Sequence, residues 1–494
     1  MNEQQENSYS HILKYTSLFG GVQGIVIVIG LIRNKAMALL LGAGGMGFNA
    51  LLMSIQNFAS QCTNLGISFA GVPKLSELYE RDDRQLDYYI RVIRLWSMIA
   101  AGLGLVFCIC ISPFVDEMSF SWGNHTLHFA MLGLAVAMAA VAGGELAILK
   151  ATRRLSSLAT IQSCTAVGGV LLSVPLYYFW HHSGVVPAIV MVAALNMVVT
   201  TAISHHYHPY LLQFERRMVK DGIDMVKLGV AFVLAAAIGS CAEMLIRSFL
   251  SKEGGLNDLG LYNAAFTITI TYAGMVFSAM ETDFFPRLSA VCQNIEDTNV
   301  TVNKQMEVSL LLLSPMLVLL MIFLPVLIPL LFSKEFVPVI GMAQVAVLAM
   351  YFKVLTLPVA YITLARRRSL AYLFLESAYF VVFVVAVMFG FKTWGVYGAG
   401  IAIVVAHVFD YLLINGFAYW KYGYRRNKKV VRSGFVQVFF GFAAFALTLT
   451  VNGIEYWLIG SVLVMVSAWY SISTLRQNVS LWNTLKRKLL HRNE

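Results

Sequence analysis

Long apolar runs recur along the whole chain, and they constrain its fold more than any other feature. Each run spans about 20 residues, which is enough to cross ~30 Å of hydrocarbon as an α-helix. The runs are continuous rather than alternating, and this favours helices over the strands of a membrane barrel. Only 13% of the 494 residues are charged, too few to cover the surface of a water-soluble protein. The sequence therefore predicts an all-α polytopic membrane protein.

About fourteen membrane-spanning segments follow from these runs. They cover approximately residues 15–41, 46–73, 89–113, 125–150, 157–180, 185–204, 224–250, 259–285, 306–332, 337–364, 370–391, 395–420, 433–452 and 455–475. Lys and Arg concentrate in alternate connections, and the positive-inside rule then predicts that both termini lie in the cytoplasm. The net charge of +10 is explained mainly by this topology and by attraction to anionic lipid head groups, without a nucleic-acid partner.

The chain also repeats itself at an offset of about 213 residues. Gly47 stands 26 positions before Pro73-Lys-Leu-Ser76, and Gly260 stands 26 positions before Pro286-Arg-Leu-Ser289. The repeated block contains six predicted spans. A duplication of this kind predicts two six-helix lobes, related by a pseudo-twofold axis along the membrane normal, with a cleft between them.

The repeat and the remaining segments predict the organisation of the chain. Residues 1–204 form an N-terminal six-helix lobe, 205–223 a cytoplasmic linker, and 224–420 a C-terminal six-helix lobe. Residues 421–494 add two helices and a basic cytoplasmic tail. The two added helices either form a side groove for a lipid tail or extend the second lobe.

Several classes of protein are disfavoured by what the chain lacks. Its predicted outer loops are short, and it has no nucleotide-binding loop, metal-ligand cluster or serine–histidine–aspartate arrangement. We therefore expect a transporter rather than an enzyme, with no cofactor and no metal. Energy would come from a Na⁺ or H⁺ gradient, from the membrane potential, or from the flow of substrate between synthesis and consumption.

The first 76 residues resemble a known family. The stretch Arg33-Asn-Lys-Ala-Met-Ala-Leu-Leu-Leu-Gly42, then Gly47, then Gly71-Val-Pro-Lys-Leu-Ser76, is similar to the opening of polysaccharide flippases of the MOP (MATE-like) superfamily, of the Wzx type. The resemblance implies a two-lobe, alternating-access flippase in the bacterial cytoplasmic (inner) membrane. Its substrate would be an undecaprenyl-pyrophosphate-linked oligosaccharide for O-antigen lipopolysaccharide, capsule or exopolysaccharide. A monomer, associated with polysaccharide-assembly proteins, is expected. Twelve spans are common in the Wzx type, and this chain departs from that number.

Charged residues inside spans are candidates for function, because each costs ~2.5–3.5 kcal/mol to insert. Arg33 lies deep in the first span, with no acidic residue within one helical turn, and Lys35 lies nearer the surface. Arg247 occupies the matching depth in the second lobe. Such cations in a cavity would bind a pyrophosphate or an acidic sugar. Glu243, one turn before Arg247, leaves open a purely structural ion pair.

Further ionisable residues are candidates for coupling or gating. His407 and Asp410 face the same side of their span, which suits a proton relay or a cation site. A bridge between Lys353 and Asp410 is the structural alternative, and Lys353 is also a candidate substrate contact. Glu145 lies near the inner end of its span, where pairing with Lys150 would suit an inner gate.

The second span carries four amide side chains that are also candidates for substrate binding: Gln56, Asn57, Gln61 and Asn64. With Ser60, most of them share one helical face at mid-membrane depth. They either line a hydrated cavity that accepts sugar hydroxyls or join helices by hydrogen bonds.

Two other functions remain open. A MATE-like ion-coupled exporter of small organic molecules would be expected to carry acids without balancing cations in its N-terminal lobe. A membrane glycan polymerase would be expected to carry a large outer loop rich in Arg or His. The chain fits neither expectation as well as it fits a flippase.

Overall fold

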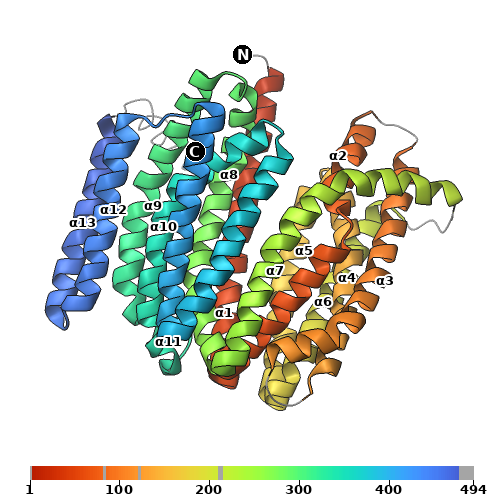
Figure 1. Cartoon of the computed structure of the whole chain (residues 1–494). Coiled ribbons are helices and arrows are strands. Elements are labelled where there is room, and N and C mark those ends of the chain that lie inside the picture. Colours follow the sequence, from red (N-terminus) through yellow and green to blue (C-terminus); the bar gives the residue numbers. More distant parts are fainter. Residues whose placement is uncertain (1–2, 82–84, 121–123, 210–214, 478–494) are drawn as a thin grey trace. The chain divides into compact units, whose positions relative to one another are not determined.

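The computed structural model describes residues 3–81, 85–120, 124–209 and 215–477 (Figure 1). Within these ranges it consists of helices and contains no β-strand, which confirms the all-α prediction. The α-helices are α1 (Glu3–Thr63), α2 (Ile67–Glu80), α3 (Leu86–Ser119), α4 (Thr126–Ala151), α5 (Leu155–Trp180), α6 (Val185–Tyr207), α7 (Arg216–Phe266), α8 (Tyr272–Val291), α9 (Ile295–Leu331), α10 (Ile340–Ala365), α11 (Ser369–Tyr422), α12 (Lys428–Thr450) and α13 (Ile454–Gln477).

Three helices are too long to cross a membrane once, and each is broken at a glycine. The breaks lie at Gly42 in α1, Gly255 in α7 and Gly395 in α11, where φ is 65°, 79° and 58°. Glycine adopts these positive angles without a steric penalty, because it lacks Cβ. The breaks at Gly42, Gly255 and Gly395 lie at or beside the boundaries between consecutive predicted spans. The second predicted span, 46–73, is not one helix, because α1 ends at Thr63 and α2 begins at Ile67, with Gly66 at a φ of 68° between them. The count of fourteen spans is therefore approximate. Nine helical stretches of the described residues are long and apolar enough to cross a membrane. The protein is a multi-pass membrane protein.

The repeat seen in the sequence recurs in the backbone. Gly42 and Gly255 are separated by the offset of the repeat, and both break a helix with nearly the same dihedral angles. Gly47 and Gly260, a second pair at this offset, lie where α1 and α7 approach most closely. A Cβ at Gly47 would overlap the carbonyl oxygen of Leu256, and a Cβ at Gly260 would overlap that of Ala43. Glycine at both positions therefore lets the two backbones pack against each other.

Contacts group the chain into two compact units, each described by itself. The first comprises Met1–Gly260 with Leu331–Ser333, and the second comprises Leu261–Leu330 with Lys334–Glu494. In the first unit α4 packs against α3 and α6, and α5 packs against α1 and α6. In the second, α10 packs against α11 and α12, and α12 and α13 run side by side (Figure 1). The lobes at 1–204 and 224–420, the linker and the C-terminal region stay a prediction; parts of the linker and of the tail lie outside the described residues.

Candidate functional site

A cavity of about 600 Å³ lies within the first unit, between α1, α4, α5 and α6. Its wall is mostly apolar, as expected of a hollow inside a helical membrane protein. Five polar side chains interrupt this wall: Arg33, Lys150, Gln162, Thr165 and Asn196. None of the residues that line it is acidic. The cavity therefore combines an apolar volume with two cations and three hydrogen-bonding groups, an arrangement typical of a site for an anionic, hydroxylated ligand.

Arg33 is held in this wall by a tyrosine. Its Nη2 donates a hydrogen bond of 3.4 Å to the hydroxyl oxygen of Tyr177, which is fully buried on α5. The Nε of Arg33 is itself buried, and it has no hydrogen-bond partner among the residues that the structure describes. Leaving a buried donor of a charged group unsatisfied costs more than ~1–3 kcal/mol. An acceptor such as a phosphate oxygen would satisfy this nitrogen, because guanidinium groups bind phosphate through paired N–H donors.

The other polar residues of the cavity come from α4, α5 and α6. Lys150, in the last turn of α4, is exposed and makes no ion pair with any described residue. Asn196 accepts hydrogen bonds through Oδ1 from Thr165 at 3.4 Å and from Thr200 at 3.3 Å. Because its amide oxygen is engaged, the amide nitrogen of Asn196 is left to donate. Cations and an amide donor together suit phosphate oxygens and sugar hydroxyls.

Sequence reasoning identified Arg33 but missed most of its neighbours. Gln162, Thr165 and Asn196 were not selected, although polar residues in the fifth and sixth predicted spans are a visible signal. The positions of 162, 165 and 169 on one face of α5 also fit a wall of the cavity. What the sequence did not reveal is which neighbouring helices contribute the remaining walls.

Lys35 does not line this cavity. Its Nζ donates a hydrogen bond of 2.5 Å to the carbonyl oxygen of Phe332, which belongs to the same unit. Lys35 follows Arg33 by two residues, which corresponds to a rotation of about 200° around the helix axis. The two side chains therefore point in different directions. A substrate role for Lys35 stays a prediction.

The four predicted amides of the second span also lie elsewhere. Asn64 Nδ2 donates to Gln61 Oε1 at 3.1 Å, and Asn64 Oδ1 accepts from the backbone N–H of Gly66 at 2.8 Å. Asn64 thus stabilises the turn between α1 and α2, and with Ser60 it lines a smaller cavity of about 160 Å³. Gln56 has a buried Oε1 with no partner in the described part of the chain, and Asn57 is exposed.

Arg247 makes the ion pair that was the structural alternative. Its Nη1 lies 2.6 Å from Glu243 Oε2, one turn earlier on α7, and the arginine side chain is almost fully buried. Neither residue lines the cavity at Arg33. The pairing neutralises the arginine, and roles for Arg247 in substrate binding and Glu243 in coupling stay predictions.

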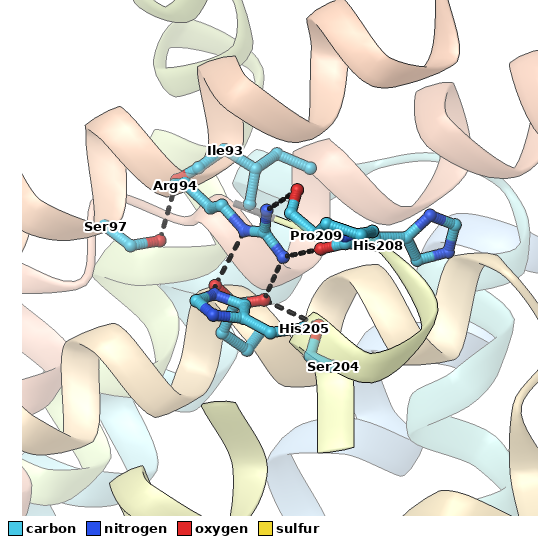
Figure 2. A network of polar contacts seen from close by, with 8 residues as sticks. Ile93, Arg94, Ser97, Ser204, His205, His208 and Pro209 are labelled. Atoms are coloured by element: carbon cyan, nitrogen blue, oxygen red, sulfur yellow. Dashed lines mark hydrogen bonds and ion pairs between the residues drawn. The ribbon is translucent and has the colours of Figure 1, made fainter. Parts of the chain in front are cut away.

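Glu145 joins a polar network in the first unit. Figure 2 labels its partners Arg94, Ser204 and His205. It pairs with Arg94 of α3, although the sequence suggested Lys150 as its partner. Ser204 donates to Glu145 Oε2 at 2.6 Å, and Nε2 of His205 lies 3.2 Å from Oε1. The carboxylate therefore joins α4 to both α3 and α6.

Arg94 completes the network by contacting the end of α6. Its Nη2 donates to the carbonyl oxygen of His208 at 2.8 Å, and Nη1 donates to that of Pro209 at 3.3 Å. These carbonyls belong to a helix C-terminus, where a cation is electrostatically favoured. Burial and the nearby Arg94 lower the pKa of the His208 side chain below its ordinary value of 6.5. No partner for Arg94 could be predicted from the sequence, because its partners lie on or beside other helices. The gating role proposed for Glu145 stays a prediction.

In the second unit, Lys353, His407 and Asp410 come close together on α10 and α11. Lys353 lies within electrostatic range of His407, Asp410 and Glu376, and Asp410 also lies within range of Glu376. His407 is buried, and its Nδ1 lies 2.8 Å from the carbonyl oxygen of Ile403. No hydrogen bond joins His407 to Asp410 within the described ranges, so their role as a proton relay or cation site stays a prediction.

A metal site is a separate question. No cluster of three or more His, Cys, Asp or Glu side chains is placed to hold a metal ion in the described part of the chain.

Comparison with known proteins places the fold. The lipid II flippase MurJ, in an inward closed conformation, superposes with a TM-score of 0.70 at 13% identity, over 94% of this chain and 99% of that one. An inward-facing multidrug resistance MATE family transporter of the MOP superfamily has a TM-score of 0.64 at 15% identity. This superposition covers 78% of this chain and 93% of that one. A MOP superfamily transporter from Pyrococcus furiosus has a TM-score of 0.55 at 17% identity, over 82% of this chain and 95% of that one. At these identities the likeness is one of fold.

Comparison of sequences identifies the family. No curated protein matches the chain significantly. The model of a family described as "Polysaccharide biosynthesis protein" matches residues 36–341, which is more than half of the chain. This match includes most of the stretch on which the resemblance to polysaccharide flippases rested. The chain therefore belongs to the polysaccharide biosynthesis protein family, and it has the fold of MOP superfamily transporters.

Proposed function

We propose that this protein is a flippase that moves an undecaprenyl-pyrophosphate-linked oligosaccharide from the inner to the outer leaflet by alternating access. The observation that carries the proposal is the cavity at Arg33, which is lined by two cations and no acid. Membership of a polysaccharide biosynthesis family supports a glycan as the cargo. The fold shared with MurJ, a lipid II flippase, supports a lipid-linked form of that glycan.

The chemistry of the cavity suits both parts of such a head group. A pyrophosphate carries concentrated negative charge, which Arg33 and Lys150 would attract. Sugar hydroxyls both donate and accept hydrogen bonds, as Gln162, Thr165 and Asn196 do. The rest of the wall is apolar and offers the glycan few hydrogen bonds. The glycan would therefore be bound weakly and could be released toward the outer leaflet.

The test is a liposome assay of lipid-linked glycan crossing. Wild-type protein is compared with Arg33→Ala, Arg33→Lys and the matched control Arg216→Ala, an exposed arginine at the start of α7. Loss of a charged hydrogen bond of ~1.5–3 kcal/mol predicts a fall in crossing rate of about tenfold or more for Arg33→Ala. Arg33→Lys should fall less, because the charge remains. Normal crossing by Arg33→Ala, with normal protein levels, would contradict the proposal.

The setting of this activity is part of the same proposal. We place the protein in a bacterial cytoplasmic membrane as a monomer, with both termini in the cytoplasm, in association with polysaccharide-assembly proteins. No cofactor is required; an H⁺ or Na⁺ gradient or the membrane potential would drive transport. His407 and Asp410 are the residues through which such coupling would act, and Glu145 and Glu243 are further candidates for coupling or gating.

A MATE-like exporter of small organic molecules is the second candidate, favoured by the shared fold. Organic cations would be repelled by the cavity at Arg33, whereas organic anions would fit it. Export of a fluorescent organic anion from cells, abolished by Arg33→Ala and without any crossing of lipid-linked glycan, would replace the flippase proposal with this one.

A further inference from the structure

A second basic hollow lies in the second unit, at the start of α12. It has a volume of about 400 Å³ and is lined by Arg426, Lys428, Val431, Arg432, Phe435 and Val436. We call these six residues the α12 hollow. Three are cationic, three are apolar, and none is acidic. None of them lines the cavity at Arg33, so the two sites are separate.

Two of the three cations of the α12 hollow are exposed to a ligand, and the third is fixed beside them. Lys428 and Arg432 are exposed, and neither forms an ion pair with any residue in the described ranges. Arg426 is fixed in place: Nη2 donates to Asn415 Oδ1 at 2.6 Å, and the guanidinium lies 4.6 Å from the centre of the Tyr411 ring. Its Nε is buried and has no hydrogen-bond partner among the described residues. The hollow thus holds one cation fixed by hydrogen bonds and two exposed cations.

The backbone adds to the positive potential. Asn427 caps α12 by accepting a hydrogen bond from the N–H of Lys429 at 3.2 Å. The N-terminal end of a helix carries a partial positive charge, which favours a bound anion. The α12 hollow begins at this end of the helix, since Lys428 is the first residue of α12.

An apolar stripe continues from the hollow along α12. Val431, Phe435, Phe439 and Phe442 are exposed by 55%, 75%, 61% and 45%. Their spacing of four, four and three residues places them on one face of the helix. A molecule that fits both features has a phosphate at one end and a long hydrocarbon chain at the other.

We propose that the α12 hollow binds an anionic phospholipid of the surrounding membrane, with its phosphate at Arg426, Lys428 and Arg432 and an acyl chain along Phe435 and Phe439. A zwitterionic phospholipid would bind less tightly, because its amine cancels the attraction. The proposal does not depend on the proposed flippase function.

The test is lipid titration of the full-length protein followed by native mass spectrometry. The variant Lys428→Gln/Arg432→Gln removes the two exposed cations. The variant Arg216→Gln/Lys220→Gln is the matched control, with the same change of charge on exposed residues of α7. Each cation near a lipid surface contributes enough to predict a loss of about tenfold or more in affinity for phosphatidylglycerol in the first variant. The control variant should bind phosphatidylglycerol as wild type does, and phosphatidylcholine binding should be the same in all three proteins.

Equal phosphatidylglycerol affinity in both variants would overturn the proposal. So would a loss confined to undecaprenyl phosphate or inorganic pyrophosphate, which would make the hollow a substrate or phosphate site. A second measurement is independent of the charge variants: Phe435→Trp adds a fluorophore on the apolar stripe. Brominated phosphatidylglycerol should quench the added fluorescence more than brominated phosphatidylcholine does at equal mole fraction. Equal quenching by the two lipids contradicts the proposal.

Discussion

Arg94 and Glu145 form a bidentate ion pair inside the first unit, with Nε to Oε1 at 2.8 Å and Nη2 to Oε2 at 3.1 Å. Both side chains are about 95% buried, so neither charge is solvated by water. The pair joins α3 to α4, and the remaining donors of Arg94 hold the end of α6. This ion pair and the further hydrogen bonds of Arg94 therefore link three helices.

Removing one charge of this pair should destabilise the protein. Glu145→Gln keeps the shape of the side chain but leaves Arg94 buried without its counterion, which predicts a loss of ~3–5 kcal/mol. Chemical denaturation of the purified protein in detergent measures the change. Glu80→Gln, which removes a partner of the exposed Arg153, is the control and should cost less than ~1 kcal/mol. Equal stability of the two variants would show that the buried pair contributes no more than the exposed one.

The second cation of the large cavity gives another prediction. If Lys150 and Arg33 bind one anionic group, Lys150→Gln should lower the rate of lipid-linked glycan crossing by about threefold to tenfold. Adding Arg33→Ala should then cost less than the two separate losses combined, because residues that share one ligand are not additive. The liposome assay measures both effects, with Lys220→Gln as the control for an exposed lysine. If the losses caused by the two substitutions were strictly additive in free energy, Lys150 and Arg33 would bind different groups of the substrate.

The close approach at Gly260 predicts sensitivity to a single methyl group. Gly260→Ala puts a Cβ against the carbonyl oxygen of Ala43, a backbone atom that cannot rotate away. Overpacking of this kind predicts a loss of ~1–3 kcal/mol, visible as a lower apparent melting temperature in detergent. Gly102→Ala on α3 is the matched control, because a Cβ there meets no atom within 4 Å. A melting temperature of Gly260→Ala at or above that of Gly102→Ala would contradict the tight crossing.

The environment of His208 predicts a dependence of stability on pH. Its pKa is lowered in the folded protein by burial first and by Arg94 second, so the fold favours the neutral ring. As the pH falls below 6.5, the unfolded chain takes up a proton before the folded protein does, and stability decreases. His208→Gln should therefore flatten the fall in apparent melting temperature between about pH 7 and 5, whereas His206→Gln, on the exposed side, should leave it as in wild type. Identical curves for wild type and His208→Gln would refute this assignment.

The sequence predicted an all-α, multi-pass membrane protein correctly, because local chemistry dictates this class of fold. Lipid offers no hydrogen bonds, so each long apolar run must form a helix regardless of its neighbours. The breaks at Gly42 and Gly255 follow the same logic, since they lie at the repeat offset and only glycine adopts those angles without strain. The family resemblance, carried by the stretch around Arg33 and Gly42, was confirmed by the match to the polysaccharide biosynthesis family.

Contacts between helices were decided by the tertiary structure. The sequence indicated that Arg33 needs an anionic partner, but not that Tyr177 holds it or that Asn196 faces the same cavity. Equally, it placed Lys150 near Glu145 along one helix, whereas the fold brings Arg94 to that carboxylate from another. Insertion into a membrane depends on the hydrophobicity of each segment by itself, so it can be read along the chain. The neighbours of a side chain depend on how helices rotate and pack together, and that information becomes available only when all of them are in place.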